Sequence, residues 1–214
     1  MPEPKIIRAN PHGRLVRPHW LDPMVDENTR TPGEHHEAIG TVVTSFNSVE
    51  LMFKYLVGMA AGLDTAAFGV FAHVGNVTLS DAARYLASKE GCDSWWADEL
   101  QFSALAFDLA RRNRNFIVHN STFRAVCFEG DDFTLMTRRS ARGTERIQHW
   151  RFPLAALRGS AESNVDLEEY FSVVCGPIRK ANRYAEGNVK LPVRPDLPRE
   201  LSKVFPEEDL IREP

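Results

Sequence analysis

The sequence lacks several features that would assign a function class directly. It has 3 cysteines, widely spaced and without a C-x-x-C pair, which argues against a disulfide framework and favours reduced thiols. It contains no P-loop, G-x-G-x-x-G or G-x-S-x-G stretch, which argues against nucleotide-cofactor binding and serine-hydrolase chemistry. No H-E-x-x-H motif accompanies its adjacent histidines, so we expect neither a metal nor another cofactor.

Long apolar runs and a net basic charge are also missing. No apolar run approaches the ~18 residues that a membrane span requires, and the first residues lack the apolar region of a secretory signal. We therefore expect a cytoplasmic protein without membrane contact. The formal net charge is -3 and the pI is about 6.2, so any site for a polyanion such as RNA must be local.

The residues that are present divide the chain into three parts. The 214 residues are 43% hydrophobic and 26% charged, as in one ordinary globular domain. Residues 1–33 are rich in proline and show no period, which predicts an extended arm that packs on its own domain or on a second subunit. Residues 34–190 form the expected folded domain. Residues 191–214 contain five prolines and few apolar anchors, which predicts a loose tail.

A mainly α-helical fold is predicted from the spacing of apolar residues. They recur every three or four positions in several segments, as on one face of a helix. The expected helices cover residues 34–60, 78–91, 94–119 and 166–188. Thr78 or Ser80 is the expected N-cap of the second helix, and Gly176-Pro177 predicts a break or kink in the last. Residues 121–152 alternate apolar and polar side chains around two turns, which predicts a small antiparallel β-meander.

The end of the third predicted helix is unusually polar. Residues 110–120, "ARRNRNFIVHN", contain three arginines, three asparagines and one histidine. Helical geometry places Arg114 on the same apolar stripe as Leu100 and Phe107, while a second apolar stripe lies opposite. A helix with two apolar faces is expected inside a bundle. Arg114 must then have a partner or line a cleft, because an unpaired buried charge costs several kcal/mol.

The first predicted helix offers that partner. Glu50 lies in the middle of its apolar stripe, and Lys54 lies one turn further, where it can pair with Glu50. We therefore expect Glu50, Lys54 and Arg114 to form one polar cluster between the two helices. Arg114 and His119 lie roughly 140° apart on a straight helix. Either the side chain of Arg114 reaches around the helix, or the helix ends near His119 and the chain reorients that residue. The change in sequence pattern after His119 favours the second alternative.

These residues resemble the signature of the HEPN superfamily of helical nucleotide-binding proteins. The family motif is R-x(4–6)-H near the end of a bundle helix, often with a polar residue after the arginine. Here it corresponds to "RNFIVH", from Arg114 to His119. A family E-x3-K/R feature corresponds to "ELMFK", from Glu50 to Lys54. The sequence departs from the pattern at Asn120, where glycine is common, and in residues 121–152, which a minimal bundle does not need.

The resemblance implies an up-and-down helical bundle that forms a homodimer and brings two copies of the motif together. It also implies metal-independent RNA cleavage, in which His119 exchanges a proton and Arg114 binds the phosphate. Asn115 would orient the histidine or the phosphate, with Glu50 and Lys54 in support. The expected RNA contacts are Arg111, Arg112 and Asn120. Toxins and phage-defence ribonucleases occur in this family, and a minimal nucleotidyltransferase antitoxin is an implied partner.

A structural interpretation of the same residues remains open. Glu50, Lys54 and Arg114 also suit a buried ion-pair network in a non-catalytic interaction module. His119 would then be a cation at a helix C-terminus, which the helix dipole favours.

Overall fold

The fold was analysed in a computed structural model. It describes residues 33–63, 69, 73–89, 94–119, 122–128, 131–139, 147–183 and 191–203, with the strands described by their backbone. Residues 1–32 of the expected arm, Asn120 and residues 204–214 of the expected tail lie outside the described residues.

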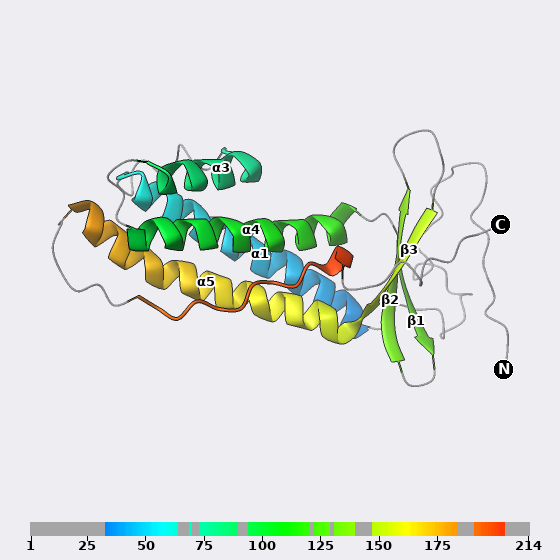
Figure 1. Ribbon diagram of the computed structural model, residues 1–214. Coiled ribbons are helices and arrows are strands. Elements are labelled where there is room, and N and C mark those ends of the chain that lie inside the picture. The colour runs from blue at the N-terminus through cyan, green and yellow to red at the C-terminus, as the bar shows by residue number, and fades with distance from the viewer. Residues whose placement is uncertain are drawn as a thin grey trace.

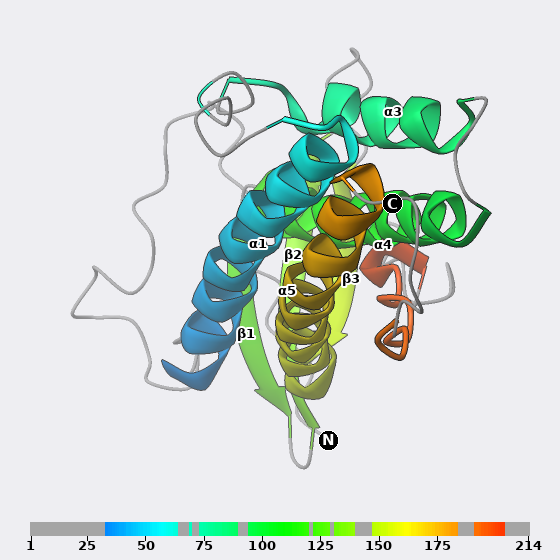
Figure 2. The ribbon, with the colours of Figure 1, turned by 90° about the vertical axis from the view of Figure 1, so that its left-hand side faces the viewer.

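The described part of the chain is mainly α-helical, as predicted. Its long helices are α1 (Gly33–Ala60), α4 (Ser94–His119) and α5 (Leu154–Arg183), and a shorter helix α3 covers Asn76–Ala87. A single 3-10 turn, η4, covers Leu201–Lys203. Helices α1, α4 and α5 lie side by side, with α3 alongside α4 near one end of the bundle (Figures 1 and 2). Among the described helices, none combines the length and apolar character needed to cross a bilayer.

Three strands lie between α4 and α5 in the sequence. They are β1 (Thr122–Phe128), β2 (Asp131–Arg139) and β3 (Ile147–Pro153). The order in the sheet is β1-β2-β3, and both pairs are antiparallel. The sheet lies beyond the end of the bundle where α4 ends and α5 begins (Figure 1).

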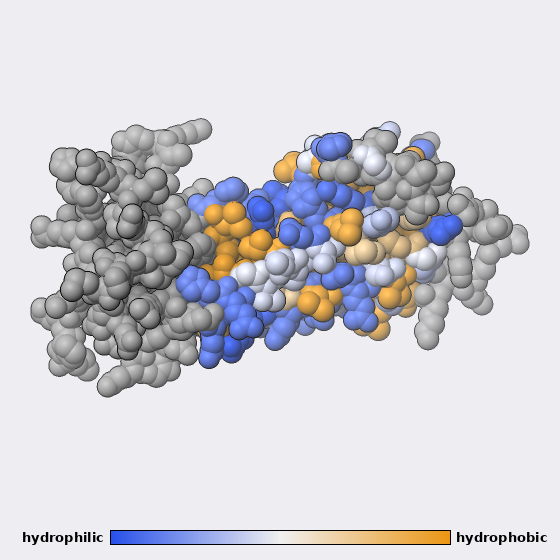
Figure 3. All heavy atoms as spheres, turned by 180° about the vertical axis from the view of Figure 1, so that it is seen from behind, coloured by the Kyte–Doolittle hydropathy of each residue, from blue (hydrophilic) through white to orange (hydrophobic). Residues whose placement is uncertain are grey.

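The main core is built by aromatic residues from three helices. Phe53 of α1 stacks on Phe107 of α4, with ring centroids 4.3 Å apart, and also contacts Phe171 of α5 at 5.5 Å. All three rings are fully buried. Burying a phenylalanine side chain contributes about 1.5–3 kcal/mol, so this cluster fixes the arrangement of the three long helices. The back of the bundle presents hydrophilic residues mixed with smaller apolar patches (Figure 3).

A second core cluster lies toward the sheet end. It joins α1, α4, the start of α5 and the C-terminal segment, through Ala38, Val42, Ile117, Leu154, Leu157, Ala161 and Leu201. Ile117 and Val42 belong to this cluster, whereas Phe107 stacks on Phe53 in the main core. Residue numbers therefore fall along α1 as they rise along α4, so the two helices are antiparallel.

The third predicted helix has the expected bounds, but it is less enclosed than expected. On the stripe of Leu100, Phe107 is fully buried but Val118 is 41% exposed. On the opposite stripe, Leu105 is 44% exposed. The reason is that alanines and polar residues fill much of the buried face of α4: Ser103, Ala104, Ala106, Ala110 and Asn113.

Three other expectations differ from the structure. Helix α3 begins at Asn76 after Gly75, with no side-chain cap, so neither Thr78 nor Ser80 is the N-cap. Helix α5 begins at Leu154 and continues through Pro177, so the alternative of a break at Gly176-Pro177 is wrong. Proline lacks only one backbone donor, and the buried residues on both sides of it, Val174 and Ile178, anchor the helix to the core.

The third difference concerns the predicted tail. The expectation that it is loose is wrong for residues 191–203, because that stretch is attached to α4. Pro198 and Leu201 are buried there. These two anchors are single apolar residues in a proline-rich run, so no periodic pattern marks them in the sequence.

Candidate functional site

The last turns of α4 carry the polar residues singled out from the sequence. Each residue advances a helix by about 100°, which places five of these polar side chains within an arc of roughly 160°. They are Arg111, Arg112, Arg114, Asn115 and His119. Asn113 and Ile117 project from the opposite side and are buried. The five residues are half-buried or exposed. This arc, the α4 polar arc, concentrates three positive charges on a chain whose net charge is negative.

Arg114 is held by its neighbour and keeps unused donors. Its Nη1 donates to Asn115 Oδ1 at 3.1 Å. Its Nε is buried and finds no hydrogen-bond acceptor within the described part of the chain. A guanidinium group presents five N–H donors in a fixed planar fork. The Asn115 contact therefore orients the fork of Arg114 and leaves other donors to bind an anion.

His119 is exposed and is the last residue of α4. Five residues after Arg114, it lies about 7.5 Å further along the helix axis and roughly 140° around it. Asn115 and His119, one turn apart, face the same direction. Because α4 stays helical as far as His119, the helix does not turn His119 toward Arg114, and the two residues lie near opposite edges of the arc. The position of Asn120 relative to them is outside the described residues.

The Glu50–Lys54 pair forms as the i,i+4 spacing predicts. Lys54 Nζ lies 2.7 Å from Glu50 Oε1, and Asn76 Nδ2 donates to Glu50 Oε2 at 3.1 Å. The two side chains are 28% and 15% exposed for Glu50 and Lys54 respectively. Asn76 is the first residue of α3, so Glu50 links α1 to the start of α3.

Glu50 does not join Arg114 in one cluster, so this expectation is wrong. Among the described residues, the two form no ion pair. The antiparallel register of α1 and α4 gives the reason. Phe107 stacks on Phe53 and also contacts Phe46, which places Glu50 at the level of Phe107. Arg114 lies seven residues further along α4, or about 10 Å.

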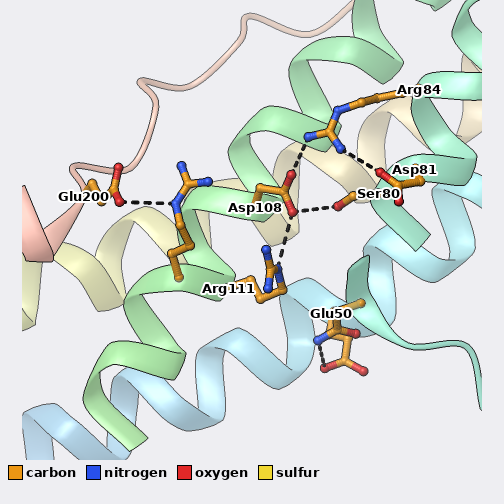
Figure 4. Close-up of polar contacts among 9 residues, drawn as sticks. Glu50, Ser80, Asp81, Arg84, Asp108, Arg111 and Glu200 are labelled. Carbon is orange, nitrogen blue, oxygen red and sulfur yellow. Dashed lines mark hydrogen bonds and ion pairs between the residues drawn. The ribbon is translucent and has the colours of Figure 1, made fainter. Parts of the chain in front are cut away.

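The carboxylate that links α3 and α4 belongs to Asp108, a residue that was not predicted from the sequence (Figure 4). Ser80 Oγ donates to Asp108 Oδ1 at 2.9 Å, and Arg84 forms a short contact with Oδ2. Arg111 Nε donates to Oδ1 at 3.4 Å, and Arg84 also pairs with Asp81 at 3.3 Å. One signal was available: Asp108 interrupts an apolar run and lies three residues before Arg111, the spacing of an ion pair on one helix.

The charge of Asp108 is stabilised by this arrangement. Burial alone would raise the pKa of Asp108. The hydrogen bonds from Arg84 and Ser80, together with the charges of Arg84 and Arg111, outweigh burial and hold the pKa below its ordinary value. Asp108 is therefore ionised at neutral pH and keeps Arg111 partly occupied.

Arg112 and Asn113 contact the C-terminal segment. Arg112 Nε lies 3.3 Å from Glu200 Oε1, and Glu200 is labelled in Figure 4. Asn113 Nδ2 donates to the carbonyl of Arg199 at 2.8 Å, and its Oδ1 accepts from the Leu201 N–H at 2.9 Å. Of the three arginines of the α4 polar arc, Arg111 and Arg112 thus have carboxylate partners, while the fork of Arg114 has only the Asn115 amide among the described residues.

Other reactive groups are few in the described residues. Among these, no group of three or more histidine, cysteine, aspartate or glutamate side chains is placed to hold a metal ion. Cys175 is half-buried, and burial raises the pKa of its thiol to about 12, so it is a neutral thiol rather than a nucleophile at neutral pH. The α4 polar arc combines arginine donors with a histidine, which are residue types suited to phosphate chemistry.

Comparisons with known proteins give no family assignment. No protein-family model, no curated protein and no solved structure matches the chain.

Proposed function

We propose that the protein is a metal-independent endoribonuclease that acts at the α4 polar arc. The observation that carries the proposal is the Arg114 fork, oriented by Asn115 and with a buried Nε that has no acceptor among the described residues. The Nε itself is closed to solvent, so a phosphate would bind the Nη donors of the fork through charge-assisted hydrogen bonds.

The residue types of the arc suit cleavage by the RNA itself. The 2′-oxygen attacks the adjacent phosphorus while the bond from phosphorus to the 5′-oxygen breaks, leaving a 2′,3′-cyclic phosphate and a 5′-hydroxyl. One proton must leave the 2′-hydroxyl and one must reach the departing 5′-oxygen. Histidine exchanges protons near neutral pH, so we assign this transfer to His119. Arg114 stabilises the negative charge that grows on the phosphate, and Arg111 and Arg112 bind neighbouring phosphates.

The geometry of the arc supports a homodimer as part of the proposal. Arg114 and His119 lie roughly 140° apart on one helix, which is unsuited to holding a single phosphate. Two copies of α4 packed together bring the arginine of one to the histidine of the other. Val118 supports this arrangement, because it lies on the same arc and is 41% exposed. Such a dimer corresponds to a HEPN-like up-and-down bundle with a small β-meander inserted between α4 and α5.

The biological role proposed with this activity is that of a cytoplasmic toxin or phage-defence ribonuclease. An RNA-cleaving enzyme harms its own cell unless it is restrained, so a partner such as a minimal nucleotidyltransferase antitoxin fits the proposal. The arm at residues 1–33 offers a further contact, either with a second subunit or with that partner.

The test is RNA cleavage by the purified full-length chain. We expect products with 2′,3′-cyclic phosphate and 5′-hydroxyl ends, formed equally well with a chelator present. His119→Ala should abolish cleavage while the thermal melt stays within about 0.5 kcal/mol of the wild type, as for a surface substitution. His36→Ala is the matched control, since His36 is exposed on α1, and it should cleave as the wild type does. Cleavage that persists in His119→Ala, or disappears with chelator, would contradict the mechanism.

A second candidate is a non-catalytic interaction module. The observation that favours it is the pairing of Glu50 with Lys54 and Asn76, which joins helices without reference to any ligand. In that case Glu50→Ala and Arg114→Ala lower the free energy of unfolding, and the wild-type chain cleaves no RNA.

A further inference from the structure

Residues 191–203, here called the strap, follow α4 in an extended conformation. In Figure 1 the strap passes in front of α5 and runs in the same direction as α4. Arg194 contacts Glu99 near the start of α4, and Leu201 contacts Asn113 near its end. Seven extended residues cover about 23 Å, and the fourteen helical residues from Glu99 to Asn113 rise about 21 Å. The two lengths agree, so the strap runs parallel to α4 and is nearly fully extended.

The first anchor of the strap is a buried carboxylate. Glu99 is only 4% exposed. Arg194 Nη2 donates to Glu99 Oε1 at 2.8 Å, its Nε lies 3.2 Å from both carboxylate oxygens, and Tyr170 also donates to Glu99. The Arg194 guanidinium lies over the ring of Phe102, 5.2 Å from its centre. A buried carboxylate requires such a cation, so this part of α4 is built to bind an arginine.

The second anchor binds the backbone of the strap. Asn113 is 1% exposed, and its side-chain amide pairs with the Arg199 carbonyl and the Leu201 N–H. Leu201 is 2% exposed within the second core cluster. A buried amide that makes both contacts fixes the register of the strap to within one residue.

The strap also places the carboxylate of Glu200 against the α4 polar arc. Glu200 pairs with Arg112 at 3.3 Å, with side chains 16% and 43% exposed respectively. An ion pair this open to solvent contributes little to stability. Its position is the informative feature, because Arg112 belongs to the α4 polar arc. A carboxylate and a phosphate offer a guanidinium the same paired oxygen acceptors.

We propose that the strap is a cis-acting competitor of RNA phosphate at Arg112. This inference rests on the proposed function. While the strap is seated, Glu200 occupies the guanidinium of Arg112. RNA then binds fully only when its phosphate replaces Glu200. The anchors at Glu99 and Asn113 hold the strap in register, so the competition concerns the carboxylate alone.

The test measures binding of the full-length chain to a single-stranded 2′-O-methyl RNA by fluorescence anisotropy, because this RNA has no free 2′-hydroxyl and cannot be cleaved. Glu200→Gln should tighten binding roughly two- to fivefold, the range that corresponds to one solvent-exposed ion pair. It should also steepen the dependence of log K on log salt by about 0.7, the value for one additional phosphate contact on a single strand.

Asp196→Asn is the matched control. It removes the same charge from the same strap, and Asp196 is exposed. Its binding and salt dependence should stay close to those of the wild type. Equal tightening by both variants means a general charge effect and overturns the inference. So does unchanged binding of Glu200→Gln when Arg112→Ala weakens binding, a result that leaves the proposed function standing. If Arg112→Ala and Arg114→Ala both bind RNA as the wild type does, the proposed function itself fails.

Discussion

Asp108 is the residue on which the polar contacts between α3 and α4 converge. Its carboxylate accepts hydrogen bonds from Ser80, Arg84 and Arg111 and is 11% exposed. A buried carboxylate is tolerated when its acceptors are satisfied by donors of this kind. The short helix α3, which has no side-chain cap, is thereby attached to α4 by charge as well as by apolar packing.

Asp108→Asn should therefore lower the free energy of unfolding. We expect a loss of about 1.5–3 kcal/mol, the range for hydrogen bonds to charged groups, and a value near its lower end because the Arg84 side chain is 45% exposed. Asp81→Asn is the control, since Asp81 is 68% exposed and pairs with the same arginine. Urea unfolding at pH 7 measures both. An equal effect of the two variants would contradict the role given to Asp108.

The same residue gives a pH dependence with a defined sign. The pKa of Asp108 in the folded chain lies below its ordinary value of 3.8. Its contribution to stability is then fully present above pH 3.8 and is lost as the pH falls through the lower folded value. The difference in stability between wild type and Asp108→Asn should therefore shrink below pH 3.8.

At the scale of single residues, the sequence was informative about local pairs and uninformative about partners on other helices. The i,i+4 spacing predicted the Glu50–Lys54 pair because one helix determines it. The expected contact of Glu50 with Arg114 was wrong because it depends on the register between α1 and α4. That register is set by Phe53 and Phe107, whose stacking no periodicity reveals.

Helix α4 is the element that the sequence predicted best. Its start at Ser94 and its end at His119 follow from the helical spacing of its apolar residues and from the change to an alternating pattern after His119. Helix α5 was expected from residue 166 but begins at Leu154. Leu154, Leu157 and Ala161 recur at helical spacing and are buried, so a signal existed there that the neighbouring strand pattern obscured.

The strap could not be predicted, because an extended segment has no period of its own. Its anchoring residues can be recognised only when their partners on α4 are known. Asn113 is the clearest case. In the sequence it is one of three asparagines in residues 110–120, and in the structure it is the residue that holds residues 199–201.

Asn113→Ala should loosen the strap. It removes two hydrogen bonds to the strap backbone, so we expect a loss of about 1–3 kcal/mol and faster hydrogen exchange at the Leu201 amide. Asn47→Ala on the exposed side of α1 serves as the control. If the Leu201 amide exchanges at the wild-type rate in Asn113→Ala, the contact does not hold the strap in solution.

At the scale of the molecule, the described residues form one helical bundle with a core cluster toward each end. The cluster of Phe53 and Phe107 joins the three long helices, and the cluster of Ile117 and Leu201 joins them to the strap. The α4 polar arc lies at the end nearer the sheet (Figure 1). Since α4 is rigidly packed over most of its length, the direction of each residue on the arc is fixed by the bundle.

The proposed dimer can be tested by mixing two inactive variants. If Arg114 of one copy acts with His119 of the other, a dimer of one Arg114→Ala chain and one His119→Ala chain retains one intact site of its two. Random reassociation through a two-fold interface makes half of the dimers mixed, so activity should recover to about a quarter of the wild-type value.

The direct measurement is RNA cleavage by each variant alone and by the two after joint unfolding and refolding. The proposed site predicts no cleavage by either variant and about a quarter of wild-type cleavage by the mixture. A wild type that cleaves RNA beside a mixture that stays inactive would contradict a site shared between two copies of α4.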